Sequence, residues 1–197
     1  MRFPAHYYLP FALALVATGA PAQEAATSPA NPVLQGELLE LRRIDQAALR
    51  DKTMAPEALE KLQDSNTKRL KDIVQKHGWP TLSMVGNDAA QGPWLVVQHA
   101  DKDHAWQRHA LALMEALVPG NEVRKTDVAY LRDRLDIADG GTQRYGTQGR
   151  CVAKHVWQPF EITDAEHLEE RRKAMDMMTE EAYLKLASRM CANFETK

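Results

Sequence analysis

The spacing of apolar residues constrains the fold of this chain most strongly. In the first such segment Leu38, Leu41 and Ile44 recur at three-residue steps, which places them on one face of a helix. Glycine and proline separate this segment from similar ones, as Gly78 and Pro80 do after the second. The helices predicted in this way cover residues 36–50 (with a start as early as 33), 56–77, 94–117, 126–138, 163–175 and 179–191. We therefore predict a mainly α fold, with about six helices packed as one bundle-like domain.

Two of these predicted helices have recognisable capping residues. Thr163 and Glu166 are spaced as a capping box, and Thr179 is a suitable N-cap for the last helix. We read the charged run 169–173 and the Asp45-Gln46 pair as solvent-exposed helix faces. The loop between the second and third helices is predicted to run from Thr81 to Gly92.

One segment departs from the helical pattern. Gln143, Tyr145 and Thr147 alternate with other residues, and residues 151–157 are rich in valine and aromatic residues. Gly149-Arg150 between them suits a two-residue type II′ turn. The sequence thus predicts a C-terminal β-hairpin that packs against the helices, with Gln143, Tyr145 and Thr147 on one face.

The first residues resemble a secretory signal peptide. Met1–Ala22 has a basic start, a short apolar core and small residues at Ala20-Pro21-Ala22. This core is too short to cross a bilayer, and no later segment is long and apolar enough to do so. We expect a flexible lead-in over residues 23–35, a single mainly helical domain over 36–197, and export to the periplasm or outside the cell.

Charge and cysteine content narrow the partners and the compartment. The 25 basic and 27 acidic residues are mixed along the chain, so no single-sign field favours nucleic acid or anionic lipid. In an oxidising compartment Cys151 and Cys191 would form a disulfide, which in the chain-entropy model contributes roughly 4 kcal/mol. Two buried free thiols are the alternative.

The residues that could carry chemistry gather in the stretch 93–109. If residues 94–117 form one helix that begins near Pro93, Gln98 and Asp101 share a face with Trp94. Polar groups on such a face must bond to neighbouring elements or line a pocket, because a buried unpaired polar group costs about 1 to 3 kcal/mol. We predict a polar pocket of the central helix and the hairpin, formed by Gln98, His99, Asp101, Gln143, Tyr145 and Gln148.

Several short motifs together resemble an uncharacterised bacterial domain family of unknown function. The resemblance covers roughly residues 36–185 and implies no activity. Its most distinctive parts are the HGWP, QHAD and YGTQ signatures. The matching residues are Asp45-Gln46, Asn66-Thr67, His77-Gly78-Trp79-Pro80, Gly86, Gln98-His99-Ala100-Asp101, Gln107, Tyr130-Leu131, Asp133-Arg134, Gln143, Tyr145-Gly146-Thr147-Gln148 and Arg171-Arg172.

Three functions remain open from the sequence. Binding of a small polar ligand or peptide suits the amides and aromatic residues of the predicted pocket. A metal-independent acid-base hydrolase or lyase would use His99, Asp101 and Tyr145, since imidazole can exchange a proton near neutral pH. An envelope inhibitor or interaction protein would instead need an exposed apolar patch for a protein partner.

Cofactor and metal chemistry have little support in the sequence. His99 and Asp103 are spaced i,i+4 on the predicted central helix, but two helical ligands make only half of a metal site. The chain has no glycine-rich phosphate loop and no Gly-x-Ser-x-Gly motif. We therefore predict no cofactor and no metal.

Overall fold

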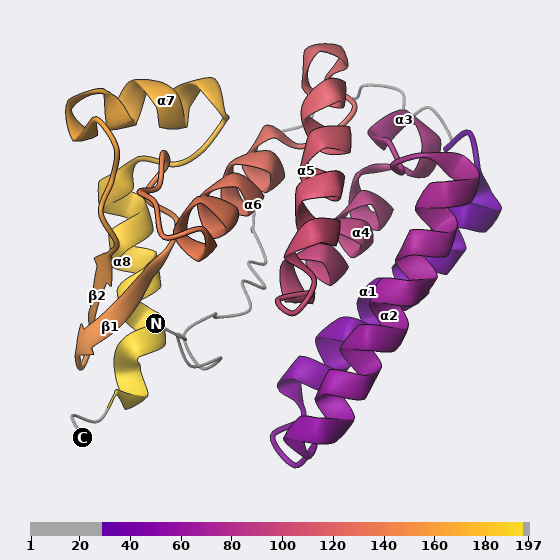
Figure 1. Cartoon of the computed structure of the whole chain (residues 1–197), viewed down its shortest axis with the longest axis horizontal. Coiled ribbons are helices and arrows are strands. Elements are labelled where there is room, and N and C mark those ends of the chain that lie inside the picture. Colours follow the sequence, from indigo (N-terminus) through magenta and orange to yellow (C-terminus); the bar gives the residue numbers. More distant parts are fainter. Residues whose placement is uncertain (1–28, 195–197) are drawn as a thin grey trace, which may run out of the picture. The chain divides into compact units, whose positions relative to one another are not determined.

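A computed structural model describes residues 29–194 of the chain, and the predicted signal peptide lies outside them (Figure 1). The described residues form eight α-helices and one two-stranded antiparallel hairpin near the C-terminus, which confirms the mainly α prediction. The helices are α1 (Pro32–Arg50), α2 (Pro56–His77), α3 (Leu82–Val85), α4 (Asn87–His99), α5 (His104–Leu117), α6 (Lys125–Ala138), α7 (Leu168–Ala174) and α8 (Glu180–Met190). The strands are β1 (Gly149–Ala153) and β2 (Val156–Pro159), and short 3-10 turns are η2 (Val118–Gly120), η3 (Ala165–His167) and η4 (Cys191–Asn193).

The chain divides into two compact units, whose described parts are residues 29–106 and 107–194. The boundary falls inside α5, and each unit is described by itself. That residues 36–197 form a single domain stays a prediction. No helix in the described range 29–194 has the length and apolar character needed to cross a membrane.

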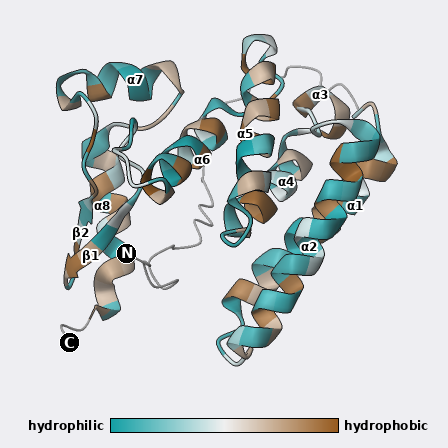
Figure 2. Ribbon diagram, in the orientation of Figure 1, coloured by the Kyte–Doolittle hydropathy of each residue, from teal (hydrophilic) through white to brown (hydrophobic). Residues whose placement is uncertain are grey.

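In the first unit α1 and α2 form an antiparallel pair, and α4 packs on α1 (Figure 1). Figure 2 shows hydrophobic and hydrophilic residues alternating along α1 and α2, as expected of helices with one buried face. Gly92 of α4 makes the close approach possible, because a Cβ atom there would lie 2.6 Å from the Leu38 carbonyl oxygen. The buried apolar residues of this unit include Leu34, Leu38, Leu41, Leu70, Ile73, Trp79, Leu95 and Val97.

The predicted central helix is wrong as a continuous element. The structure has two helices instead, α4 and α5, with a turn over residues 100–103. The Asp103 side chain accepts a hydrogen bond from the Trp106 backbone N–H at 3.0 Å and so caps the start of α5. Its other carboxylate oxygen lies 2.5 Å from Lys71 Nζ, which ties the turn to α2.

The loop predicted over residues 81–92 is also wrong, because that segment is largely helical. The Thr81 hydroxyl accepts from the Met84 N–H at 3.2 Å and caps α3. Gly86, at φ 79°, then turns the chain directly into α4. Pro93 consequently lies inside α4 and not in its first turn. The predicted stop after His77 is confirmed, with Gly78 at φ 74° as the C-cap.

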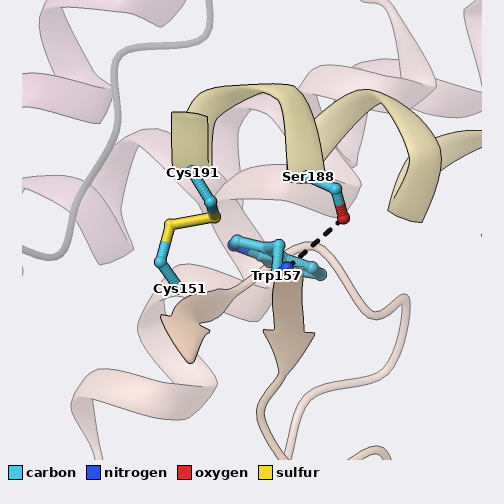
Figure 3. The surroundings of a disulfide bond; sticks show 4 residues. All are labelled: Cys151, Trp157, Ser188 and Cys191. Carbon is cyan, nitrogen blue, oxygen red and sulfur yellow. Dashed lines mark hydrogen bonds between the residues drawn. A yellow bond between two sulfur atoms is a disulfide. The ribbon is translucent and has the colours of Figure 1, made fainter. Parts of the chain in front are cut away.

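In the second unit α8 lies against β2, and a disulfide fastens its C-terminal end to the hairpin (Figure 3). Cys151 of β1 and Cys191 of η4 form this bond, with Cα atoms 5.6 Å apart, as predicted. Figure 3 shows Trp157 beside the disulfide, and its backbone N–H donates to the Ser188 hydroxyl at 3.3 Å. The Trp157 and Tyr183 rings meet edge to face, with centroids 5.5 Å apart.

The hairpin lies further along the chain than predicted. β1 pairs with β2 through Cys151 opposite Trp157, and the turn is at Lys154-His155. Gly149 is therefore a strand residue, and a Cβ atom there would collide with the Trp157 ring and the Gln158 carbonyl. Residues 143–148, predicted as the first strand, form a loop instead.

The capping box at Thr163 is not formed. Asp164 adopts a left-handed conformation at φ 50°, and the chain passes through η3 before α7 begins at Leu168. The predicted cap of the last helix is confirmed, since Thr179 Oγ1 accepts from the Ala182 N–H at 3.3 Å.

Candidate functional site

A loop over residues 143–148, here called the YGTQ loop, is organised around the buried carboxylate of Asp133 on α6. This carboxylate accepts hydrogen bonds at 2.8 to 3.2 Å from the backbone N–H groups of Arg144, Tyr145 and Thr147. The Thr147 hydroxyl donates a further bond at 2.9 Å. Burial raises the pKa of Asp133, and the hydrogen bonds from the loop oppose that rise.

Two of the three glutamines of the predicted site, Gln143 and Gln148, hold the ends of the same loop. Gln143 Nε2 donates to the carbonyls of Gln148 and Phe160 at 2.8 and 2.9 Å, and Gln143 Oε1 accepts from the Gln148 N–H at 2.7 Å. Both side chains are buried. The structure thus brings Gln143 and Gln148 together, and their contacts are those of a scaffold.

A fully buried arginine supports the loop from α7. Arg172 donates to the Tyr145 carbonyl and lies over the Tyr183 ring, 5.1 Å from its centroid. The Tyr183 hydroxyl in turn donates to the Thr147 carbonyl at 2.9 Å. The prediction that Arg172 belongs to a solvent-exposed face is therefore wrong.

Tyr145 is half-buried, whereas its neighbour Arg144 in the same loop is exposed. Burial raises the pKa of the Tyr145 phenol, and the nearby Asp133 carboxylate raises it further. The hydroxyl therefore stays protonated at neutral pH and can donate a hydrogen bond, but it is unsuited to act as a base.

In the first unit His99 pairs with the carboxylate of Asp45, a partner that the sequence analysis did not predict. His99 Nδ1 lies 2.9 Å from Asp45 Oδ1, and Gln46 Nε2 donates to Asp45 Oδ2 at 2.9 Å. The side chain of Asp45 is 1% exposed and that of His99 is 11% exposed. The prediction that Asp45 and Gln46 lie on a solvent-exposed face is wrong, because α1 turns both toward the interior.

The remaining predicted site residues lie close to His99 in the sequence. Gln98 is buried in α4, and Asp101 is half-buried in the turn before α5. Gln98, His99 and Asp101 belong to the first unit, whereas Gln143, Tyr145 and Gln148 belong to the second. That these two sets of residues meet in one pocket stays a prediction.

A cavity of about 470 Å³ opens beside the YGTQ loop, within the second unit. We call it the polar pocket, because every residue around it except one glycine has a charged or hydroxyl side chain. Its walls are supplied by the end of α6, the start of the YGTQ loop, the segment before η3, and α7. The lining residues are Asp136, Asp139, Gly141, Thr142, Arg144, Thr163, Asp164 and Arg171.

Most charges of the polar pocket are already paired. Arg171 donates to the carbonyls of Arg144 and Thr163 at 2.9 and 2.6 Å and lies 3.3 Å from Asp164. His167 also bonds to Asp164, at 2.9 Å. This hydrogen bond, together with the positive charges of His167 and Arg171, lowers the pKa of the Asp164 carboxyl. Asp139 pairs with Arg108 at 2.7 Å.

Arg144 and Asp136 form the loosest pair in the pocket. Arg144 Nε lies 3.4 Å from Asp136 Oδ2, and that oxygen receives no hydrogen bond from the residues that the structure describes. Burial raises the pKa of Asp136, while Arg144 and Arg132 lower it and Asp139 raises it. The pocket thus presents an incompletely satisfied carboxylate next to a guanidinium.

Sequence reasoning missed the polar pocket and the partner of His99. The pocket residues come from four segments and have no common spacing, so only the fold brings them together. Asp45, by contrast, belongs to one of the motifs that carry the family resemblance. That membership was the signal by which the sequence could have indicated a role for Asp45. Among the described residues, no three His, Cys, Asp or Glu side chains are placed to hold one metal ion.

Comparison with known proteins gives a family and no activity. The model of a family of unknown function, DUF6624, matches residues 32–192. No curated protein and no solved structure matches the chain. The resemblance to an uncharacterised domain family is confirmed, and because the match spans most of the sequence, this chain belongs to the DUF6624 family.

Proposed function

We propose that the protein binds a small polar ligand or peptide in the polar pocket. The observation that carries this proposal is the lining of a 470 Å³ cavity by charged and hydroxyl side chains, without aliphatic or aromatic ones. The donors and acceptors that these side chains carry favour a ligand held by hydrogen bonds and charge. The proposed class is therefore hydrophilic small molecules and not lipids or aromatic compounds.

The hydrogen bonds that hold the backbone at Arg144 favour ligand binding by a pre-organised site. The Arg144 backbone is fixed by the Asp133 carboxylate at 2.8 Å, and the Arg144 carbonyl is fixed by Arg171 at 2.9 Å. The backbone at Arg144 is therefore ordered before a ligand binds, and only the Arg144 side chain has to be ordered on binding.

A ligand screen with an assigned NMR spectrum tests this function. Wild-type protein is titrated with a panel of sugars, polyols, amino acids and dipeptides. The expected result is saturable shifts of the amide signals of Thr142, Arg144 and Thr163, which Arg144→Ala weakens at least tenfold. Arg150→Ala is the matched control, because Arg150 is exposed on β1 and does not line the pocket. Shifts that fall elsewhere, or none with any compound, would reject the proposal.

Metal-independent acid-base catalysis at His99, as a hydrolase or lyase, is a second candidate. The pairing of His99 with Asp45 favours it, because a ring N–H donated to a carboxylate leaves the other ring nitrogen, Nε2, as the proton acceptor. Gln46 holds the carboxylate in place through its second oxygen. Asp45 takes the orienting role that the sequence analysis gave to Asp101.

Hydrolysis of p-nitrophenyl acetate gives a general test of this second candidate. If His99 is an activated base, His99→Ala removes most of the esterase rate, and Asp45→Asn reduces it. His104→Ala serves as control, since His104 begins α5 and makes no pair with a carboxylate among the hydrogen bonds of the described residues. Equal rates for the wild type, His99→Ala and His104→Ala would exclude an activated His99.

We also propose that the protein is exported. The disulfide between Cys151 and Cys191 supports this proposal, because such bonds persist in oxidising compartments. Fractionation of cells that express the full chain should place the protein outside the cytoplasm, with a mature N-terminus near Gln23. An intact N-terminus on cytoplasmic protein would contradict the proposal.

A further inference from the structure

We infer that the ligand of the polar pocket is a small zwitterion, with a carboxylate and an ammonium group, such as an amino acid or a short peptide. This inference rests on the proposed binding function and narrows it to one chemical class. It comes from the way in which opposite charges alternate around the cavity and from the two groups that are least satisfied there.

Arg144 offers the anion-binding side. Its side chain is 57% exposed, and its guanidinium has one near neighbour, Asp136, with Nε 3.4 Å from Oδ2. The terminal nitrogens of Arg144 make no hydrogen bond to the described residues, so they can form a two-pronged contact with a ligand carboxylate. Arg171 adds positive charge nearby, but two of its nitrogens are committed to backbone carbonyls.

Asp136 offers the cation-binding side. Asp139 and Asp164 have close partners at 2.7 and 2.9 Å, whereas Asp136 has only the loose contact with Arg144. Asp136 also lacks a hydrogen-bond donor at its buried Oδ2. The Asp136 side chain is 22% exposed, so a ligand ammonium beside it would supply the opposite charge in a setting that is drier than bulk water.

Charge complementarity separates a zwitterion from the other hydrophilic ligands. A simple anion at Arg144 would face the three pocket carboxylates, and a simple amine at Asp136 would face two guanidinium groups. A neutral sugar would displace water from charged groups without replacing that interaction. A ligand with adjacent opposite charges meets both sides at once, because its carboxylate lies toward Arg144 and its ammonium toward Asp136.

The test compares L-alanyl-L-alanine with two derivatives of the same skeleton, the N-acetyl dipeptide and the C-terminal amide. Calorimetry and NMR titration on the wild-type chain should show binding of the dipeptide, with shifts at Thr142 and Arg144. Each derivative, which lacks one charge, should bind at least tenfold more weakly.

Two variants assign each charge to its partner. Arg144→Gln should weaken the dipeptide about tenfold or more and leave the weak binding of the amide unchanged. Asp136→Asn should weaken the dipeptide and leave the N-acetyl derivative unchanged. Both changes are on partly exposed side chains, so folding is expected to persist. Arg150→Gln should bind the dipeptide as the wild type does.

The outcomes distinguish the two proposals. Binding of a neutral sugar at Thr142 and Arg144, without binding of the dipeptide, would overturn the zwitterion and leave the polar pocket as a binding site. Equal affinity for the dipeptide and both derivatives would also overturn it. The absence of shifts with the dipeptide and with every member of the wider panel would overturn both.

Discussion

At the scale of single residues, Asp133 has the largest structural task. Its buried carboxylate accepts hydrogen bonds from four donors of the YGTQ loop, three backbone N–H groups and one hydroxyl. Asp133→Asn places an amide NH₂ against some of these donors, which leaves buried groups unpaired. The expected loss in the free energy of unfolding is about 2 to 5 kcal/mol. Denaturation with urea measures it.

The control for this change is Asp139→Asn, at the C-cap of the same helix. Asp139 is 53% exposed and makes a surface pair with Arg108. Such pairs contribute about 0 to 1 kcal/mol, so this variant should unfold almost as the wild type does. Similar losses for the two variants would show that the YGTQ loop does not depend on the Asp133 carboxylate.

The buried carboxyl of Asp127 makes the stability of the folded protein depend on pH. Burial raises the pKa of its carboxyl to about 6, from an ordinary value of 3.8, although Arg124 lies 2.6 Å away. Between these two values the folded protein keeps a proton that the unfolded chain releases. The free energy of unfolding that this retained proton contributes is therefore fully present below about pH 4. It is lost as pH rises through about 6, and the loss amounts to up to roughly 3 kcal/mol.

Asp127→Asn isolates this effect because the amide does not titrate. The free energy of unfolding of the variant should fall less between pH 4 and pH 7 than that of the wild type. The difference between the two curves is the quantity to measure, since other carboxyl groups titrate in both proteins. A constant difference across this range would mean that Asp127 has an ordinary pKa in the folded state.

At the scale of elements, the packing of α4 on α1 depends on the absence of a side chain at Gly92. A Cβ atom there would lie 2.6 Å from the Leu38 carbonyl oxygen, so Gly92→Ala must push the helices apart. We expect a loss of about 1 to 3 kcal/mol, as for other overpacked sites. Gly36→Ala in α1 is the control, because a Cβ atom there meets nothing within 4 Å. That variant should gain about 0.5 to 1 kcal/mol from helix propensity, and thermal unfolding of both variants provides the measurement.

The elements that could be predicted from the sequence are those with local signals. Gly78 ends α2, Thr179 starts α8, and the helical spacing places α1 and α6 within a few residues of their observed bounds. The break between α4 and α5 depends on the Asp103 side chain, which also meets Lys71 of a distant helix. Neighbouring residues could not reveal that contact.

The hairpin was predicted too early in the chain because a contact between distant residues determines this segment. Alternation over residues 143–148 is typical of a strand, yet Asp133 from α6 takes up the N–H groups that a strand would offer to its partner. Gln143 and Gln148 hold this loop, and their part in ligand binding stays a prediction. The polar pocket beside them is lined in part by their neighbours Thr142 and Arg144. The His99 prediction found a residue with a notable partner, but the partner is Asp45 on α1.

At the scale of the whole molecule, the disulfide closes a loop of 40 residues within the second unit. This loop contains β2, η3, α7 and α8, and its end at Cys191 keeps α8 against the hairpin. Tyr183 of α8 also donates to the Thr147 carbonyl, so the bond indirectly supports the YGTQ loop. The first unit, residues 29–106, contains no cysteine.

Loss of the disulfide should therefore act on one unit and spare the other. We expect the double change Cys151→Ser and Cys191→Ser to lower the free energy of unfolding by about 2 to 4 kcal/mol. Hydrogen exchange read by mass spectrometry should show faster exchange in α8, the hairpin and residues 143–148, with α1 and α4 unchanged. Reducing agent should reproduce this pattern in the wild type and have no effect on the variant. Equal loss of protection in α1 and α8 would instead show that residues 36–197 unfold together as a single cooperative domain.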